Sequence, residues 1–164
     1  MIRPVHLSDA KAITDIHNYY IENSVANLEE RCTPLAVIEQ RIEKITEHFP
    51  WLVYIHNNIL IGYAYASDWK PRSGYRQTAE TTIYIKNNIE QRGIGTALYK
   101  ELIQQLKDQS FINIIMLISH YCQRSGYEQS RPKGAIAYRF CWQLLFFFQT
   151  SIQDLLYSDP VTYH

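Results

Sequence analysis

The most informative segment of this chain reads Gln91-Arg92-Gly93-Ile94-Gly95-Thr96-Ala97-Leu98. It follows an alternating segment over residues 80–86 that is typical of a strand, and it opens a segment whose apolar residues recur at helical spacing. Glycines between a strand and a helix let the backbone approach a ligand closely, and the unpaired N–H groups of the first helical turn favour an anion. The segment therefore predicts a site for a phosphate or pyrophosphate, with a plain tight turn as the alternative.

Spacing within this turn excludes two common phosphate-binding motifs. A P-loop has a Lys-Ser or Lys-Thr pair after its last glycine, whereas Gly95 is followed by Thr96 and Ala97. A dinucleotide-binding fingerprint has a third small residue three positions after Gly95, where this chain has Leu98. If the turn binds a phosphate, it belongs to another class of site.

Hydrophobic periodicity predicts strands and helices on both sides of the turn. The predicted strands cover residues 2–5, 51–56, 59–67, 80–86 and 112–118. The predicted helices follow Ser8 or Asp9, Pro34 and Thr96. A tight hairpin at Asn57-Asn58 joins the second and third strands, because asparagine tolerates the positive φ that such a turn requires. This order predicts an α/β or α+β fold in which helices flank a mixed sheet.

Length and composition limit the class of protein. The 164 residues favour a single domain covering residues 1–164, and equal numbers of basic and acidic residues, 16 of each, argue against a nucleic-acid partner. No segment reaches the ~20 apolar residues that cross a bilayer, and the N-terminus lacks the apolar core of a signal peptide. The three cysteines and six histidines show no disulfide or metal-binding spacing. We therefore expect a cytoplasmic protein with no membrane segment and no bound metal.

Residues 84–85 and the turn at residues 91–98 resemble motif A of the GNAT family of N-acetyltransferases, in which the loop amides hold the pyrophosphate of acetyl-CoA. Four further segments resemble its phosphinothricin and methionine sulfoximine acetyltransferase branch: residues 16–20, 50–53, 62–66 and 69–80. The last of these is specific to the branch, and the resemblance covers residues 2 to about 119. It implies the GNAT fold with a mostly antiparallel central sheet, acetyl-CoA as co-substrate, a small-molecule amine as substrate and a homodimer.

The resemblance also implies roles for individual residues. The pantetheine arm and the acetyl carbonyl would be bound by the strand backbone of Ile83, Tyr84 and Ile85. The pyrophosphate would be cradled by Gln91, Arg92, Gly93, Ile94, Gly95 and Thr96. Glu80 would be the general base that takes a proton from the substrate amine. The substrate loop would consist of Arg72, Ser73, Gly74 and Tyr75, with Glu29 as a weaker candidate for the substrate site.

Elementary chemistry agrees with these roles. Acetyl transfer requires a neutral amine, so a carboxylate near the acceptor helps when its pKa lies near the working pH. Backbone N–H groups can stabilise the developing oxyanion, and an arginine can bind a carboxylate or phosphinate through two parallel hydrogen bonds. Each residue also has a plainer interpretation. Glu80 can be a solvated charge at a strand end, Arg72 a loop charge and Tyr75 a core residue.

Two departures from the family pattern are visible. Glu90 stands where the family usually has glutamine or arginine, which predicts weaker pyrophosphate binding. Residues 120–164 lack the family's asparagine-containing turn and its CoA-contacting helix, so we interpret this quarter as a rearranged or frame-altered end. Its apolar block, residues 135–156, fits either a helix face or a buried strand. The general acid for the leaving thiolate is unassigned, because Tyr121 would serve only by chance of geometry.

The leading interpretation is an acetyl-CoA-dependent N-acetyltransferase that acts on a small amino acid or analogue, such as phosphinothricin or methionine sulfoximine. One alternative is a catalytically impaired acyl-CoA-binding module with an altered C-terminus. The other is a protein or peptide N-acetyltransferase, and the match at residues 69–80 argues against it.

Overall fold

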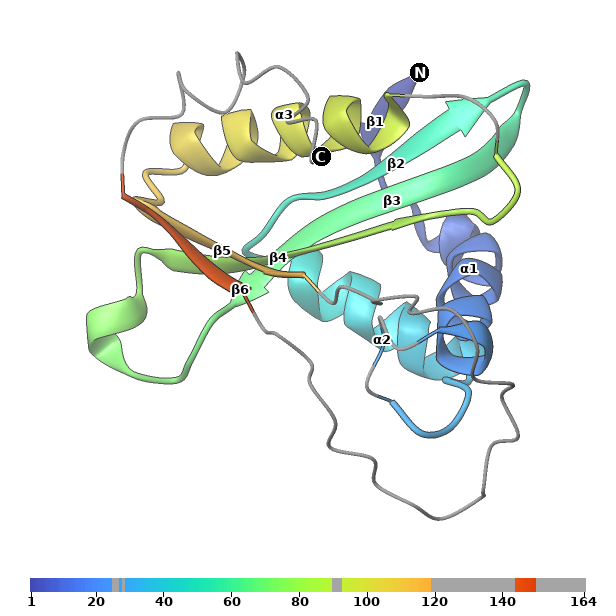
Figure 1. Cartoon of the computed structure of the whole chain (residues 1–164), viewed down its shortest axis with the longest axis horizontal. Coiled ribbons are helices and arrows are strands. Elements are labelled where there is room, and N and C mark those ends of the chain that lie inside the picture. The colour runs from blue at the N-terminus through green and yellow to red at the C-terminus, as the bar shows by residue number, and fades with distance from the viewer. Residues whose placement is uncertain (25–26, 28, 90–92, 119–143, 150–164) are drawn as a thin grey trace, which may run out of the picture.

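A mixed six-stranded sheet forms the centre of the molecule (Figure 1). The computed structural model describes residues 1–24, 27, 29–89, 93–118 and 144–149. The strands, in their order across the sheet, are β1 (Ile2–Pro4), β2 (Trp51–His56), β3 (Ile59–Asp68), β4 (Thr78–Ile85), β5 (Asn113–Ile118) and β6 (Leu144–Gln149). Neighbouring strands are antiparallel except for the parallel pair β4–β5. The predicted mixed, mostly antiparallel sheet is confirmed.

Helices cover both faces of this sheet (Figure 1). They are α1 (Ala10–Asn23), α2 (Leu35–Thr46) and α3 (Ile94–Asp108), with short 3₁₀ turns η1 (Leu7–Asp9) and η2 (Ser73–Tyr75). Two apolar cores result, because successive strand side chains point to opposite faces. On β2, Leu52 packs into the core under α3, whereas Trp51 and Val53 pack into the core with α1 and α2. We call these the α3 face and the α1/α2 face.

Local chemistry explains most element ends. The predicted hairpin is confirmed, since Asn57 and Asn58 have φ of 48° and 61°. Helix α3 begins at Ile94, earlier than the prediction after Thr96, because Gly93 adopts a left-handed conformation (φ 85°) immediately before it. Helix α1 begins directly after Asp9, one of the two predicted caps, but the Asp9 side chain does not cap it. Its carboxylate instead accepts the His6 N–H at 2.8 Å, and it makes no capping hydrogen bond to α1.

The described part of the C-terminal block is a strand. Strand β6 pairs with β5 from Asn113↔Gln149 to Ile118↔Leu144, so the helix alternative is wrong for residues 144–149. The rest of residues 135–156, together with Tyr121 and Glu90, lies outside the described residues. Within the part of the chain that the structure describes, no helix has the length and apolar character needed to cross a membrane.

Candidate active site

Strand β4 separates two kinds of side chain. Ile83 and Ile85 pack against the apolar core of the α3 face. Tyr84 packs against the core of the α1/α2 face, and strand alternation puts Glu80 and Thr82 on that same face. The predicted general base therefore shares a face with Tyr84 and not with the isoleucines on either side of it.

Among the described residues, one edge of β4 is open over its C-terminal half. Residues 78–81 of β4 pair with β5, but no β5 partner follows for residues 82–85. On its other edge β4 stays paired with β3 as far as Ile85↔Gly62. Backbone N–H and C=O groups on the open edge are therefore available to a ligand in extended conformation. The stretch includes the three residues predicted to bind the pantetheine arm, but only Ile83 and Ile85 direct backbone groups to the open edge, because those of Tyr84 point to β3.

The glycine turn lies beside this open edge. Gly93 is exposed and adopts a left-handed conformation. No atom of the described residues lies within 4 Å of the Cβ that another residue would place there. Glycine is therefore favoured by the backbone conformation and not by a lack of space. A Cβ on Gly95 would lie 3.8 Å from the Ile83 side chain, an ordinary contact. The turn and the strand are thus neighbours. Gln91 and Arg92, predicted to join the cradle, lie outside the described residues.

The start of α3 offers backbone donors. No side chain caps the helix, and its first described intrahelical bond runs from the Ala97 N–H to the Gly93 carbonyl at 2.9 Å. The preceding first-turn N–H groups therefore face the loop side of the helix, where an anion is favoured. The Ile94 side chain is buried in the α3 core, whereas Thr96 is exposed. Ile94 can serve a phosphate only through its backbone.

Glu80 is half-buried on the α1/α2 face. Burial raises the pKa of its carboxyl above the ordinary glutamate value. Among the described residues, no hydrogen bond or ion pair to this carboxylate is present. A carboxylate without a cationic partner and with a raised pKa is suited to accept a proton.

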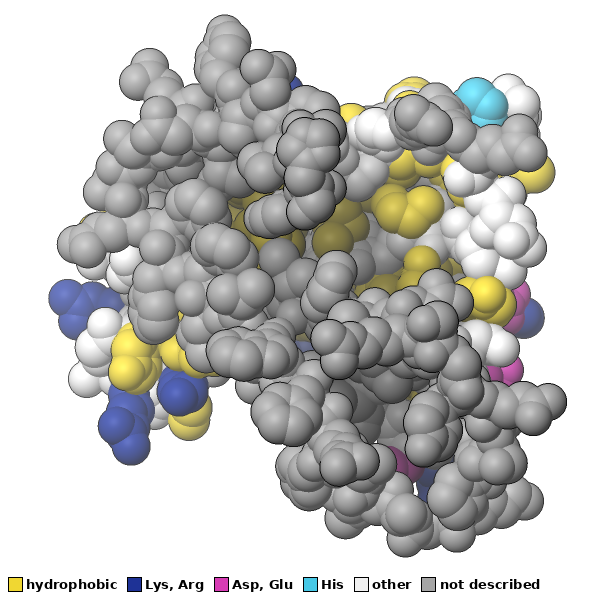
Figure 2. All heavy atoms as spheres, in the orientation of Figure 1, with side chains coloured by type: hydrophobic (Ala, Val, Ile, Leu, Met, Phe, Trp, Pro, Cys, Tyr) yellow, Lys and Arg dark blue, Asp and Glu magenta, His cyan; other side chains and the backbone are white. Residues whose placement is uncertain are grey.

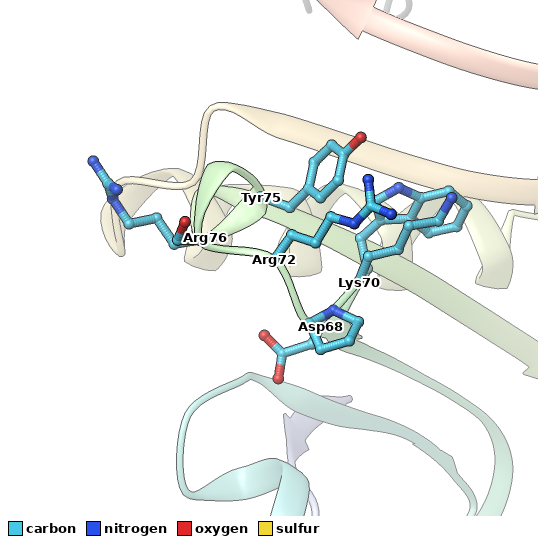
Figure 3. Close-up of a pocket in the computed structure, with 8 residues that line it drawn as sticks. Asp68, Lys70, Arg72, Tyr75 and Arg76 are labelled. Carbon is cyan, nitrogen blue, oxygen red and sulfur yellow. The ribbon is translucent and has the colours of Figure 1, made fainter.

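The β3–β4 loop holds a cationic cavity of about 330 Å³. Its lining consists of Asp68, Trp69, Lys70, Pro71, Arg72, Ser73, Tyr75 and Arg76. Figure 3 shows Lys70, Arg72 and Tyr75 directed to one side of the loop and Arg76 directed away from them. In Figure 2, dark blue basic side chains and hydrophobic ones gather at the edge of the molecule formed by this loop. A cavity with several cations is suited to a carboxylate or phosphinate.

The cavity unites most of the predicted substrate loop but does not include the predicted base. Arg72, Ser73 and Tyr75 line it, and Tyr75 is exposed rather than a core residue. Gly74 lies in η2 with open space around it and does not line the cavity. Glu80 is not among the lining residues either; it pairs with Ser67 across the β3–β4 ladder, near the base of the loop.

Sequence reasoning missed a buried polar network on the α1/α2 face. Asn27 accepts the Glu29 N–H through Oδ1 (2.9 Å), so its Nδ2 donates to His17 Nε2 at 3.3 Å. The proton of His17 therefore lies on Nδ1, which donates to the Tyr63 hydroxyl at 3.2 Å. Burial lowers the pKa of His17 and outweighs the opposing Glu29 carboxylate, 3.7 Å from Nε2. His17 is thus neutral, and its ring edge packs on Tyr84.

Glu29 belongs to this network, because its carboxylate accepts hydrogen bonds from Thr33 and Arg41. Burial acts to raise its pKa, but hydrogen bonds from Thr33 and Arg41, at 2.5 and 2.9 Å, hold the pKa below the ordinary value. The sequence analysis singled out Glu29 and segments 16–20 and 62–66, but none of these signals revealed the hydrogen bond between His17 and Tyr63. Among the described residues, no group of three His, Cys, Asp or Glu side chains is arranged to hold a metal ion.

Comparison with known proteins identifies relatives. The acetyltransferase (GNAT) domain family matches residues 2–125. A phosphinothricin N-acetyltransferase of Streptomyces viridochromogenes is 36% identical over 118 residues, which are 71% of this chain and 64% of that protein. An L-methionine sulfoximine/L-methionine sulfone acetyltransferase of Pseudomonas paraeruginosa is 26% identical over 161 residues, covering 92% of this chain and 94% of the relative.

A solved structure shares the fold. The crystal structure of a GNAT superfamily phosphinothricin acetyltransferase from Sinorhizobium meliloti, in complex with acetyl-CoA, matches with a TM-score of 0.70 and 32% identity, covering 72% of this chain and 65% of that one. The chain thus spans just under two thirds of the length of the Sinorhizobium meliloti and Streptomyces viridochromogenes relatives.

Proposed function

This chain belongs to the acetyltransferase (GNAT) family, and we propose that it transfers an acetyl group from acetyl-CoA to the amine of a small amino acid or analogue, such as phosphinothricin or methionine sulfoximine. The observation that carries the proposal is the open edge of β4, where Ile83 lies beside Gly95 of the glycine turn. An extended edge next to an anion site fits a ligand with an amide-bearing arm and a pyrophosphate. The proposed class of acceptor is supported by two relatives whose names specify phosphinothricin and methionine sulfoximine or sulfone as the acetylated compounds.

The proposed mechanism is direct transfer between two bound substrates. The first-turn N–H groups of α3 hold the pyrophosphate, and the open edge of β4 holds the arm. The amine nitrogen forms a bond to the acetyl carbonyl carbon, the carbon–sulfur bond breaks, and the proton lost by the amine goes to Glu80, directly or through water. The thiolate leaves and takes up a proton from a donor that we do not assign. Backbone N–H groups on β4 stabilise the oxyanion.

Selection of the acceptor is assigned to the β3–β4 loop. Arg72 binds the carboxylate or phosphinate of the acceptor, and Ser73, Gly74 and Tyr75 shape the rest of the site. The loop ends where β4 begins, at Thr78, so an acceptor held there has its amine near Glu80. A protein or peptide acceptor receives no support from this small cationic cavity.

The test is thiol release from acetyl-CoA with phosphinothricin or methionine sulfoximine as acceptor. Glu80→Gln should lower kcat by about 100-fold or more, the scale of general base catalysis, without changing acetyl-CoA affinity. Glu43→Gln, an exposed carboxylate on α2, is the matched control and should be unaffected. Unchanged turnover in Glu80→Gln would remove Glu80 as the base. Tight acetyl-CoA binding without turnover of any acceptor would favour the impaired binding module instead.

We also propose that the protein is a single-domain, metal-free homodimer located in the cytoplasm. The family resemblance supports the homodimer, and the scattered cysteines support the reducing compartment. Light scattering on the purified chain tests the assembly, since a monomeric mass would contradict it. Activity that survives dialysis against a chelator would support metal-free catalysis.

A further inference from the structure

We propose that the Tyr20 hydroxyl is a positioning group that sets the register in which an acyl-CoA arm binds along β4. The inference rests on the proposed function, because it concerns the same open edge. Tyr20 belongs to α1, and its hydroxyl donates to the backbone carbonyl of Ile85 at 2.6 Å. That contact joins residues 65 positions apart and lies at the end of the open edge.

Two hydrogen bonds reveal which backbone groups of β4 point to the open edge. At one end, the Gln77 carbonyl accepts N–H groups from the start of β5, including that of Asn113. At the other end, the Lys86 N–H donates to Ile61 of β3 at 2.8 Å. Backbone groups of successive strand residues point to alternate sides, so odd-numbered residues of β4 face β5 and even-numbered residues face β3.

The open edge therefore presents the peptide groups of Ile83 and Ile85. Pairing with β5 ends at Thr81, so the N–H and C=O of Ile83 have no strand partner among the described residues. The carbonyl of Ile85 already accepts the Tyr20 hydroxyl, so an amide donor of the arm would have to share that oxygen. An arm that enters from the glycine turn passes Ile85 first and reaches its first unshared carbonyl at Ile83.

The hydrogen bond from Tyr20 to Ile85 affects where the thioester lies. Without the Tyr20 hydroxyl, the Ile85 carbonyl would be a second unshared acceptor for the arm, two residues nearer the glycine turn. Two strand residues span about 6.6 Å, so an arm bound to Ile85 would hold its acetyl group about that much farther from Glu80 than an arm bound to Ile83. The hydroxyl thus disfavours an unproductive register rather than adding a contact to the ligand.

Aromatic packing fixes the position of the Tyr20 side chain. The centroid of its ring lies 5.0 Å from that of Tyr84 and 5.6 Å from that of Tyr19. Burial raises the pKa of Tyr20, which keeps the hydroxyl protonated as a donor at neutral pH. Tyr20→Phe keeps the ring and removes only the donor. Tyr19→Phe is a matched control, because among the described residues the Tyr19 hydroxyl makes no hydrogen bond.

The experiment measures kcat and KM for acetyl-CoA together with equilibrium binding by calorimetry. Unproductive binding lowers kcat and KM by the same factor, so Tyr20→Phe should lower both by about threefold to tenfold, the range of one net hydrogen bond, with kcat/KM unchanged. The Kd for acetyl-CoA should fall by a similar factor. The Kd for ADP, which carries a pyrophosphate but no arm, should not change, and Tyr19→Phe should match the wild type.

Each other outcome overturns the inference. A raised KM, or equal losses of acetyl-CoA and ADP binding with a lowered Tm, would mean that Tyr20 only supports the structure. Kinetics identical to the wild type would mean that the Ile85 carbonyl does not compete for the arm. If the wild type does not bind acetyl-CoA, the proposed function fails as well, so the two failures are distinguishable.

Discussion

On the α3 face of β4, Ile83 and Ile85 pack in an apolar core, whereas on the α1/α2 face Tyr84 packs against His17 and Glu80 is half-buried. The pleat of one strand thus puts apolar support on one face and the proposed general base on the other, and among the described residues the backbone edge between them has no strand partner beyond Thr81. If this division is right, variants on the α3 face should mainly change stability. On the α1/α2 face, variants of Glu80 should mainly change chemistry, whereas variants of the buried polar network should lower stability through lost hydrogen bonds.

The largest expected effect comes from the core of the α3 face. Leu102 is fully buried on α3. Leu102→Ala should lower the free energy of unfolding by about 2–5 kcal/mol, because it removes buried methyl groups and leaves a cavity. Denaturant unfolding measures the loss, and Leu102→Met, which conserves volume, should cost less than about 1.5 kcal/mol. Equal, small losses in both variants would contradict a close-packed α3 core.

A smaller loss of stability is expected from a substitution at Gly62, where β3 lies close to β4. A Cβ on Gly62 would lie 2.8 Å from the Ile85 side chain and 3.2 Å from the Tyr84 carbonyl oxygen. Gly62→Ala should destabilise the fold by about 1–3 kcal/mol, since overpacking displaces Ile85 at the open edge. Gly74→Ala has open space around it and should stay within about 0.5 kcal/mol of the wild type. Thermal unfolding of both variants decides whether the close approach matters.

The buried network on the α1/α2 face gives the next test. Tyr63→Phe leaves the His17 Nδ1–H without its acceptor and should cost about 1–2 kcal/mol, the scale of an unpaired buried donor. Tyr54→Phe makes the same change beside the α3 core, where no described residue bonds to that hydroxyl, and should cost less than about 0.5 kcal/mol. Equal unfolding free energies for the two variants would refute the asymmetry between the faces.

The smallest effect concerns pH. Because burial raises the pKa of Glu80, kcat/KM should fall with decreasing pH at a higher pH than an ordinary glutamate would give. A raised pKa also means that the folded state binds this proton more tightly than the unfolded state, so the carboxyl opposes folding once it ionises. Glu80→Gln should therefore have a Tm at neutral pH no lower than the wild type. A lower Tm would contradict the assigned burial effect.

Local patterns predicted most of the elements. Asparagines at 57–58 indicated the hairpin, and apolar spacing indicated three helices, because turn conformation and helical faces depend on residues only a few positions apart. The start of α3 was misplaced because the left-handed residue was not assigned to Gly93. Within residues 135–156, the block with no clear period was decided at 144–149 by pairing with β5, which is information from a distant segment.

By itself, the sequence determined the glycine turn, the order of strands and helices, and the family to which they point. Only the tertiary structure decided that β4 leaves β5 after Thr81, that Tyr20 occupies the Ile85 carbonyl and that His17 bonds to Tyr63. The roles assigned to Glu80 and the substrate loop stay predictions. The physical reason is the difference between local and long-range interactions. Turns and helices depend on residues that are close in sequence, whereas strand register and buried hydrogen bonds form between distant segments whose relative placement no local pattern encodes.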